Sequence, residues 1–218
     1  MKRVAQLLIF ILAGSGLFLF FQTKNDVRIN QLAQTISEPP KVEEKAEEKK
    51  ENPNGDIPLQ QQLASPPEII KAVYATGWTA GSVKGLNRLI DLIKKTELNA
   101  IVIDIKDYSG EISYPTEIEE VEKYGKGRDI KILRPNAMIK KLHDEGIYVI
   151  ARQTIFQDPV LAKARPDLAL TSSSTGKQWL DNKKVMWLDP AGKEIWDYNI
   201  LIAKDALARG FDEINFDY

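Results

Sequence analysis

The sequence predicts an α/β domain built on a parallel sheet, and two observations lead to this fold class. From about residue 68 onward, short apolar segments rich in β-branched residues alternate with segments whose apolar residues recur at helical spacing. The apolar segments are almost continuously hydrophobic, which is typical of parallel strands covered by helices. A doubly wound sheet and a barrel both fit this pattern. No Gly-x-Gly-x-x-Gly motif follows the first strand, which disfavours dinucleotide binding.

The expected order of elements is four strands separated by helices. Three longer helices should begin at Ser82, Pro135 and Asp189, because these residue types cap or open helices. Gly146 and Gly210 should end the second and third of these helices. The strands are expected at residues 69–75, 99–105, 147–151 and 211–218.

The first 23 residues predict a transmembrane signal anchor. Lys2 and Arg3 precede an uncharged run over residues 4–21, which as a helix would span ~27 Å of the ~30 Å hydrocarbon core. The positive charges precede the run, so the rest of the chain should lie outside the cytoplasm. A cleaved signal peptide, which would make the protein secreted, is the alternative. It is less favoured because the small residues at 13–16 come before further apolar residues.

Residues 24–66 predict a disordered linker, because glutamate, lysine and proline dominate them. Such a segment buries too little apolar surface to offset the entropy of the chain. The folded domain is therefore expected at residues 67–218.

Composition excludes several classes of function. The 30 lysines and arginines balance 31 acidic residues, so no basic excess indicates nucleic-acid binding. The chain has no cysteine, which excludes a thiol nucleophile and a cysteine-based zinc site. Its single histidine, His143, is the only one available for a histidine-based metal site or a Ser-His-Asp triad. We expect neither a metal nor a cofactor.

Polar residues gather toward the carboxyl ends of the expected strands, where α/β folds place their sites. Strand alternation puts Asp104 and Lys106 on one face of the second strand, away from its isoleucines. It likewise puts Glu213, Asn215 and Asp217 on one face of the fourth strand. These polar faces should point into a barrel, with Asp217 nearest its carboxyl end.

Each of these side chains also has a structural interpretation. Asp104, Lys106, Arg152 and Glu213 could neutralise one another in a buried network, because unpaired buried charges are costly. Lys106 could instead form a Schiff base. With Asp107, Asp104 could bind a metal, although two carboxylates are weak evidence for one.

Three aromatic residues follow strand ends. Trp78, Tyr108 and Tyr114 are expected in loops beyond the strands, where exposed rings can stack on sugars. The alternative is that they close the top of the core.

Four motifs together resemble a bacterial family of predicted glycoside hydrolases with a TIM barrel, distantly similar to the α-amylase clan. The likeness extends over residues 67–218 and rests on residues 71–78, 99–114, 149–152 and 210–218. The resemblance implies the first four strands of a (β/α)8 barrel and a nucleophile at Asp217. Asn215 stands where the wider clan often has arginine. The clan takes its general acid from strand five and a further carboxylate from strand seven, so this chain is expected to be inactive by itself.

The expected function is therefore a membrane-anchored, extracytoplasmic glycoside hydrolase that acts on a cell-surface or matrix polysaccharide. One alternative is a non-catalytic carbohydrate- or cell-wall-binding module on the same scaffold. Another is a lyase or aldolase that uses Lys106. Besides Asp217 as nucleophile, the expected substrate-binding residues are Trp78, Asp104, Lys106, Asp107, Tyr114, Arg152 and Asn215.

Overall fold

The computed structural model describes residues 55–218. The predicted anchor and most of the predicted linker lie outside the described residues. Within residues 55–218, no helix is both long enough and apolar enough to cross a membrane. The anchor therefore stays a prediction from sequence.

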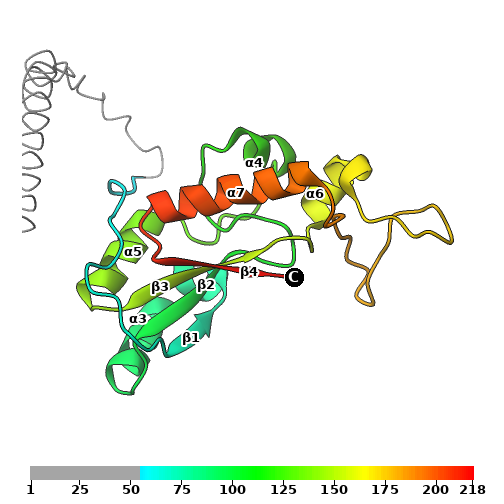
Figure 1. Ribbon diagram of the computed structural model, residues 1–218. Helices are drawn as coiled ribbons and strands as arrows, with labels where there is room; N and C mark the ends of the chain where they lie inside the picture. Colours follow the sequence, from blue (N-terminus) through cyan, green and yellow to red (C-terminus); the bar gives the residue numbers. More distant parts are fainter. Residues whose placement is uncertain (1–54) are drawn as a thin grey trace, which may run out of the picture. The chain divides into compact units, whose positions relative to one another are not determined.

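The domain is built on a four-stranded sheet in which all neighbouring strands are parallel (Figure 1). Spatial order follows sequence order, β1-β2-β3-β4, which confirms the predicted α/β class with a parallel sheet. The strands are β1 (Ala72–Ala75), β2 (Ala100–Lys106), β3 (Tyr148–Thr154) and β4 (Glu213–Asp217). The third strand continues past its predicted end, because Arg152, Gln153 and Thr154 all pair with β4.

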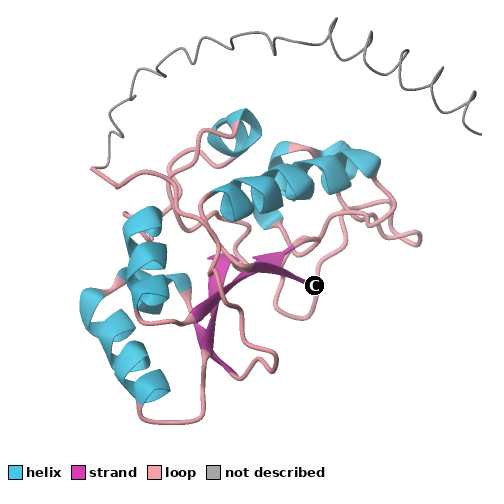
Figure 2. Cartoon of the chain, turned by 60° about the vertical axis from the view of Figure 1, so that its left-hand side comes forward, coloured by secondary structure: helices cyan, strands magenta, loops and turns pink. Residues whose placement is uncertain are grey.

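The longer helices flank the sheet (Figure 2). Two of the predicted starts are confirmed, because Ser82 caps one helix through Gly85 N and Pro135 occupies the first turn of the next. The predicted start at Asp189 is wrong. Its carboxylate accepts a hydrogen bond from Ala191 N at 3.0 Å and so forms a turn ahead of the helix. The helices are α2 (Gly77–Gly81), α3 (Val83–Lys94), α4 (Glu119–Tyr124), α5 (Pro135–Asp144), α6 (Pro159–Ala164), the short 3-10 helix η1 (Pro166–Leu168) and α7 (Lys193–Ala208).

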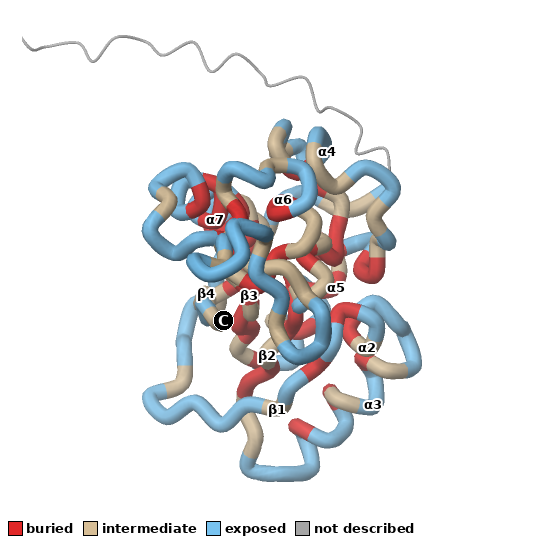
Figure 3. Tube along the Cα trace, turned by 90° about the vertical axis from the view of Figure 1, so that its right-hand side faces the viewer, coloured by how far each residue is buried: buried red, intermediate tan, exposed pale blue. Residues whose placement is uncertain are grey.

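The core lies between the sheet and these helices, and Figure 3 shows buried residues concentrated on β2, β3 and the inner side of α7. Ile101, Ile103 and Ile105 of β2 are completely buried, as are Leu142 of α5 and Ile202 of α7. Burying one such side chain contributes roughly 1.5–3 kcal/mol. The prediction that the isoleucines of β2 face the helices is therefore confirmed. The predicted alternation of side chains along β2 holds as far as Asp104.

Part of the predicted linker lies against the domain. Asp56 caps α5 by accepting hydrogen bonds from Asn136 N at 2.9 Å and Ala137 N at 3.0 Å. Leu63 N donates to Asp212 Oδ1 at 2.6 Å. The first backbone N–H groups of a helix have no partner within it, so a carboxylate delivered by a distant segment can dock that segment. These contacts join residues 56–63 to the described domain.

A β-bulge in β2 changes which side chains face the helices. Asp104 pairs in register with Arg152, but the next registered pair joins Lys106 to Gln153, so β2 contains one extra residue. A bulge of this kind reverses the alternation of the residues that follow it. Lys106 consequently turns toward α7, on the same side as Gln153, and the prediction that it points into the barrel is wrong.

Candidate active site

Side chains from all four strands meet on the sheet face that points away from the helices. The Tyr74 hydroxyl donates to Asp104 Oδ2. Arg152 donates from Nη1 to Asp104 Oδ1 at 2.6 Å and from Nε to Asp217 Oδ2 at 2.8 Å. The guanidinium therefore joins the carboxylates of β2 and β4 across β3. The sequence separates these residues by up to 143 positions, and only the parallel register brings them together.

The charges in this cluster change the acidity of its members. Burial alone would lower the pKa of Arg152, but its hydrogen bonds to Asp104 and Asp217 raise that pKa above its ordinary value. Burial and the hydrogen bond to Asp104 raise the pKa of Tyr74 to about 12. The tyrosine therefore stays protonated and remains a hydrogen-bond donor at neutral pH.

The Asp217 carboxylate is more accessible than those of Asp104 and Asp107. Its side chain is 42% exposed, compared with 4% for Asp104 and 17% for Asp107. Its Oδ1 accepts a hydrogen bond from Tyr218 N at 2.9 Å, while Oδ2 faces Arg152. Both oxygens are thus oriented, yet the group remains open to a ligand. A fixed and accessible carboxylate at a strand's carboxyl end suits nucleophilic attack.

Asp107, another predicted substrate-binding residue, is already paired. Its Oδ2 accepts from Lys131 Nζ at 2.7 Å, and its Oδ1 accepts from Ser109 N at 2.9 Å. Burial would raise the pKa of Asp107, but these contacts hold it below its ordinary value. This carboxylate holds the loop after β2 to the residues that lead into α5.

Lys106 lies beneath the helices rather than beside Asp217. Its Nζ is 2.7 Å from Asp158 Oδ2 and donates to Thr154 O at 2.9 Å, and the side chains of the ion pair are 0% exposed. Asn199 of α7 also accepts from this ammonium group, at 3.4 Å. No substrate carbonyl can reach the amine in this arrangement, so the structure removes the basis for the Schiff-base hypothesis.

The three predicted sugar-stacking aromatics separate into two groups. Trp78 is 59% exposed and Tyr108 is 66% exposed, although Trp78 lies on α2 rather than in a loop. Tyr114 is completely buried, and its ring centroid lies 4.8 Å from the Arg209 guanidinium. The expectation that Tyr114 is an exposed aromatic is therefore wrong: the loop after β2 folds back, and Ser113 N donates to Ile105 O.

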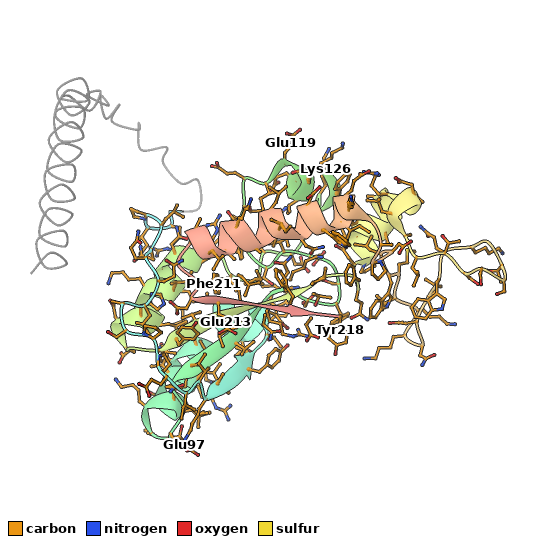
Figure 4. All side chains as sticks on the ribbon, viewed as in Figure 1. Glu97, Glu119, Lys126, Phe211, Glu213 and Tyr218 are labelled. Atoms are coloured by element: carbon orange, nitrogen blue, oxygen red, sulfur yellow. The ribbon has the colours of Figure 1, made fainter. Side chains whose placement is uncertain are left out.

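The remaining polar residues of β4 differ in position. Asn215 is exposed and pairs in register with Arg152. Glu213 lies at the opposite end of β4 from Tyr218 (Figure 4). Tyr148 OH donates to Glu213 Oε2 at 3.4 Å, so this glutamate contacts the start of β3 instead of Asp217.

Sequence reasoning missed Tyr74 and Tyr218 as members of the site. The Arg152 guanidinium carbon lies 5.9 Å from the Tyr74 ring centroid and 5.4 Å from that of Tyr218, within cation–π range. Alternation along β1 could have indicated Tyr74, because it occupies the face opposite Val73 and Ala75.

No group of three or more His, Cys, Asp or Glu side chains within residues 55–218 could hold a metal ion. Asp104 and Asp107, the pair considered as metal ligands, each bind a cationic side chain of the protein instead.

Comparisons with known proteins agree with this architecture. The profile of a family described as "Putative glycosyl hydrolase domain" matches residues 72–218. A hypothetical protein from Ruminiclostridium thermocellum, solved by crystallography, is 44% identical over 67% of this chain and 75% of its own, with a TM-score of 0.61. A comparison with curated protein sequences found no match.

A chitobiase from Flavobacterium johnsoniae is similar in fold, with a TM-score of 0.50 at 11% identity. The match covers 67% of this chain but 23% of the chitobiase. At this level of identity, the likeness concerns the fold of the parallel four-stranded sheet alone. With a family profile that spans two thirds of its residues, the chain belongs to the glycosyl hydrolase family described above.

Proposed function

We propose that this protein is an extracytoplasmic, membrane-anchored glycoside hydrolase that cleaves a cell-surface or matrix polysaccharide, with Asp217 as its nucleophile. The observation that carries this proposal is the Asp217 carboxylate. It is oriented by Arg152 and by the Tyr218 amide, and it is accessible at the carboxyl end of β4. The sequence supports the anchor through its apolar N-terminal run.

Arg152 is proposed to orient the nucleophile. The wider clan that the sequence resembles often has arginine where this chain has Asn215. Arg152 is the register partner of Asn215 on the neighbouring strand, and it reaches Asp217 from there. The guanidinium thus comes from β3 rather than β4. Asp217 therefore has a cationic partner although this chain has Asn215 where the wider clan often has arginine.

A retaining hydrolase needs a second carboxyl group about 5–5.5 Å from the nucleophile, which donates a proton to the leaving oxygen. Asp104 does not fit that role, because one of its oxygens accepts from Tyr74 and the other from Arg152. Asp107 is paired with Lys131. We therefore assign the proton donor to neither Asp104 nor Asp107; the resemblance to (β/α)8 glycosidases implies that this group comes from strand five of the barrel.

Two Asp217 variants would test the role of Asp217 as nucleophile. Asp217→Asn should abolish release of reducing ends from cell-surface polysaccharides, because an amide cannot form the glycosyl–enzyme bond. Asp217→Ala should be rescued by azide, which attacks the anomeric carbon from the vacated position, releases the leaving sugar as an alcohol and forms a glycosyl azide that mass spectrometry detects. Glu213→Gln, at the far end of the same strand, is the matched control and should retain activity.

Unchanged hydrolysis by Asp217→Asn would remove Asp217 from its role. Binding without hydrolysis by the unmodified protein would favour a carbohydrate-binding module, in which the exposed rings of Trp78 and Tyr108 suit stacking on sugars.

A further inference from the structure

Three aromatic rings form a continuous series that ends at the candidate nucleophile. Trp179 and Trp187 lie in the long segment between η1 and α7, and their ring centroids are 6.2 Å apart at an interplanar angle of 72°. Trp187 and Tyr218 are 6.4 Å apart at 71°. Tyr218 follows Asp217 directly and lies over the Arg152 guanidinium. We call these three rings the aromatic wall.

The segment that carries the two tryptophans projects beyond the carboxyl end of β4 (Figure 1), which is the end where Tyr218 lies (Figure 4). Its base is fixed by backbone hydrogen bonds of 2.8 Å from Leu188 N to Phe156 O and from Phe156 N to Tyr218 O. The wall is therefore attached to the sheet edge that carries Asp217.

Asp181 fixes the central ring of the wall. Its Oδ1 accepts from Lys183 N at 2.8 Å and Val185 N at 2.9 Å, which closes a tight turn. Its Oδ2 accepts from Trp187 Nε1 at 3.2 Å and from Gln157 Nε2 at 3.1 Å. These donors, with Val185 N contributing most, hold the pKa of Asp181 below its ordinary value. The turn and the indole are thus oriented by a single carboxylate.

The wall leaves large aromatic surfaces open to solvent. Trp179 is 40% exposed and Tyr218 is 57% exposed. Edge-to-face packing fixes the orientation of neighbouring rings relative to one another, while Trp179 and Tyr218 keep these exposed fractions. Exposed aromatic groups that are held rigidly and continue into a polar site are typical of ligand-binding surfaces, where they provide contact area at low entropic cost.

We propose that the aromatic wall binds the sugar units of an oligosaccharide chain next to the unit positioned at Asp217. Pyranose rings present an apolar face of C–H groups that stacks on an indole or phenol, and their hydroxyl groups remain in water. A wall of three consecutive rings suits a chain of sugars better than a single glycoside. This proposal rests on the proposed function, which supplies the carbohydrate as the ligand. It adds that the substrate is a polymer whose neighbouring sugar units extend from Asp217 toward Trp179.

The test measures binding separately from catalysis. The full chain, labelled with a fluorophore, is applied to an array of neutral and acidic oligosaccharides of graded length. Binding should strengthen with chain length. Trp179→Ala should weaken binding of the longer oligosaccharides about tenfold, as expected for loss of an aromatic anchor, and should leave the shortest ones unchanged. Trp179→Phe keeps a ring face and should recover part of the loss.

Two further variants separate the wall from general effects. Trp196→Ala removes an exposed indole from α7, where Nε1 donates to Pro190 O, and should leave binding unchanged. Asp181→Asn keeps an oxygen for the turn but replaces one acceptor oxygen with an NH2 group. It should weaken binding of longer chains and change the tryptophan emission spectrum, because Trp187 loses its partner.

Three outcomes would contradict the proposed role of the aromatic wall. They are binding that does not depend on chain length, unchanged binding by Trp179→Ala, and no binding to any oligosaccharide on the array. Failure of the proposed function has a different signature: Asp217→Asn would hydrolyse normally while Trp179→Ala still lost binding.

Discussion

At the scale of single residues, the properties of the site depend on Arg152. Its guanidinium contacts Asp104, which is almost completely buried, and Asp217, which is accessible. Removing one member of a buried ion pair costs more than the pair contributes, because the remaining charge has no partner. Asp104 would keep only its hydrogen bond from Tyr74.

We expect Arg152→Ala to lower the free energy of unfolding by about 3 kcal/mol, as for other broken buried pairs. Urea denaturation followed by circular dichroism would measure this. The matched control is Arg165→Ala, which breaks exposed pairs with Asp167 and Glu194 and should cost less than about 1 kcal/mol. Equal losses in the two variants would contradict a special role for Arg152.

At the scale of elements, Asp212 connects three parts of the chain at the start of β4. Its Oδ2 accepts from Val149 N of β3 at 2.7 Å and lies 2.9 Å from His143 Nε2 of α5. Its Oδ1 accepts from Leu63 N, which docks the N-terminal segment. Burial alone would raise the pKa of Asp212, but these contacts, led by the one from His143, hold it below the ordinary value of 3.8.

A carboxyl group whose pKa is lower in the folded state stabilises the fold above its unfolded pKa. That stabilisation should be fully present at neutral pH and decline as the pH falls below about 4 toward the folded pKa. Asp212→Asn should therefore lower stability at pH 7 by about 2 kcal/mol and reduce the loss of stability in acid. Asp144→Asn, which removes an exposed partner of Lys140, is the control. If the free energy of unfolding fell equally with decreasing pH in Asp212→Asn and in the unmodified chain, Asp212 would not contribute to the acid sensitivity of the fold.

At the scale of the described domain, the strands of the sheet differ in how well neighbouring strands and apolar side chains protect them from local opening. β2 and β3 each have a hydrogen-bonded neighbour on both sides, whereas β1 and β4 are the edge strands of the sheet. Phe216 lies on the helix-facing side of β4 and is 52% exposed, so β4 is less covered than β3. Backbone amides without a neighbouring strand and with little apolar cover open most easily.

Hydrogen exchange followed by mass spectrometry should therefore be slowest in β2 and β3 and faster in β1 and β4. This order follows from the number of neighbouring strands and from burial. Exchange in β4 as slow as in β3 would show that another strand pairs with this edge in solution, as in a closed barrel or in a dimer.

Much of the architecture could be predicted from the sequence. Hydrophobic periodicity predicted all four strands and the three longer helices, because a covered parallel strand and an amphipathic helix leave different local patterns. The cap at Ser82 and the proline in the first turn of α5 are local chemistry and were predicted correctly. The start of α7 was not, because Asp189 serves a turn that depends on the path of the preceding loop. The short helices α4 and α6 lie within segments that gave no periodic signal.

The sequence by itself determined the fold class, the strand alternation that placed Asp104 and Asp217 on one face, and the residues that identify the family. Only the tertiary structure decided which of these charges belong to the site. A bulge turned Lys106 under α7 to Asp158, loop folding buried Tyr114, and register brought Arg152 to Asp217. The physical reason is that local pattern fixes which face a side chain takes along one strand. Its partners are set by pairing and packing with segments far away in the chain.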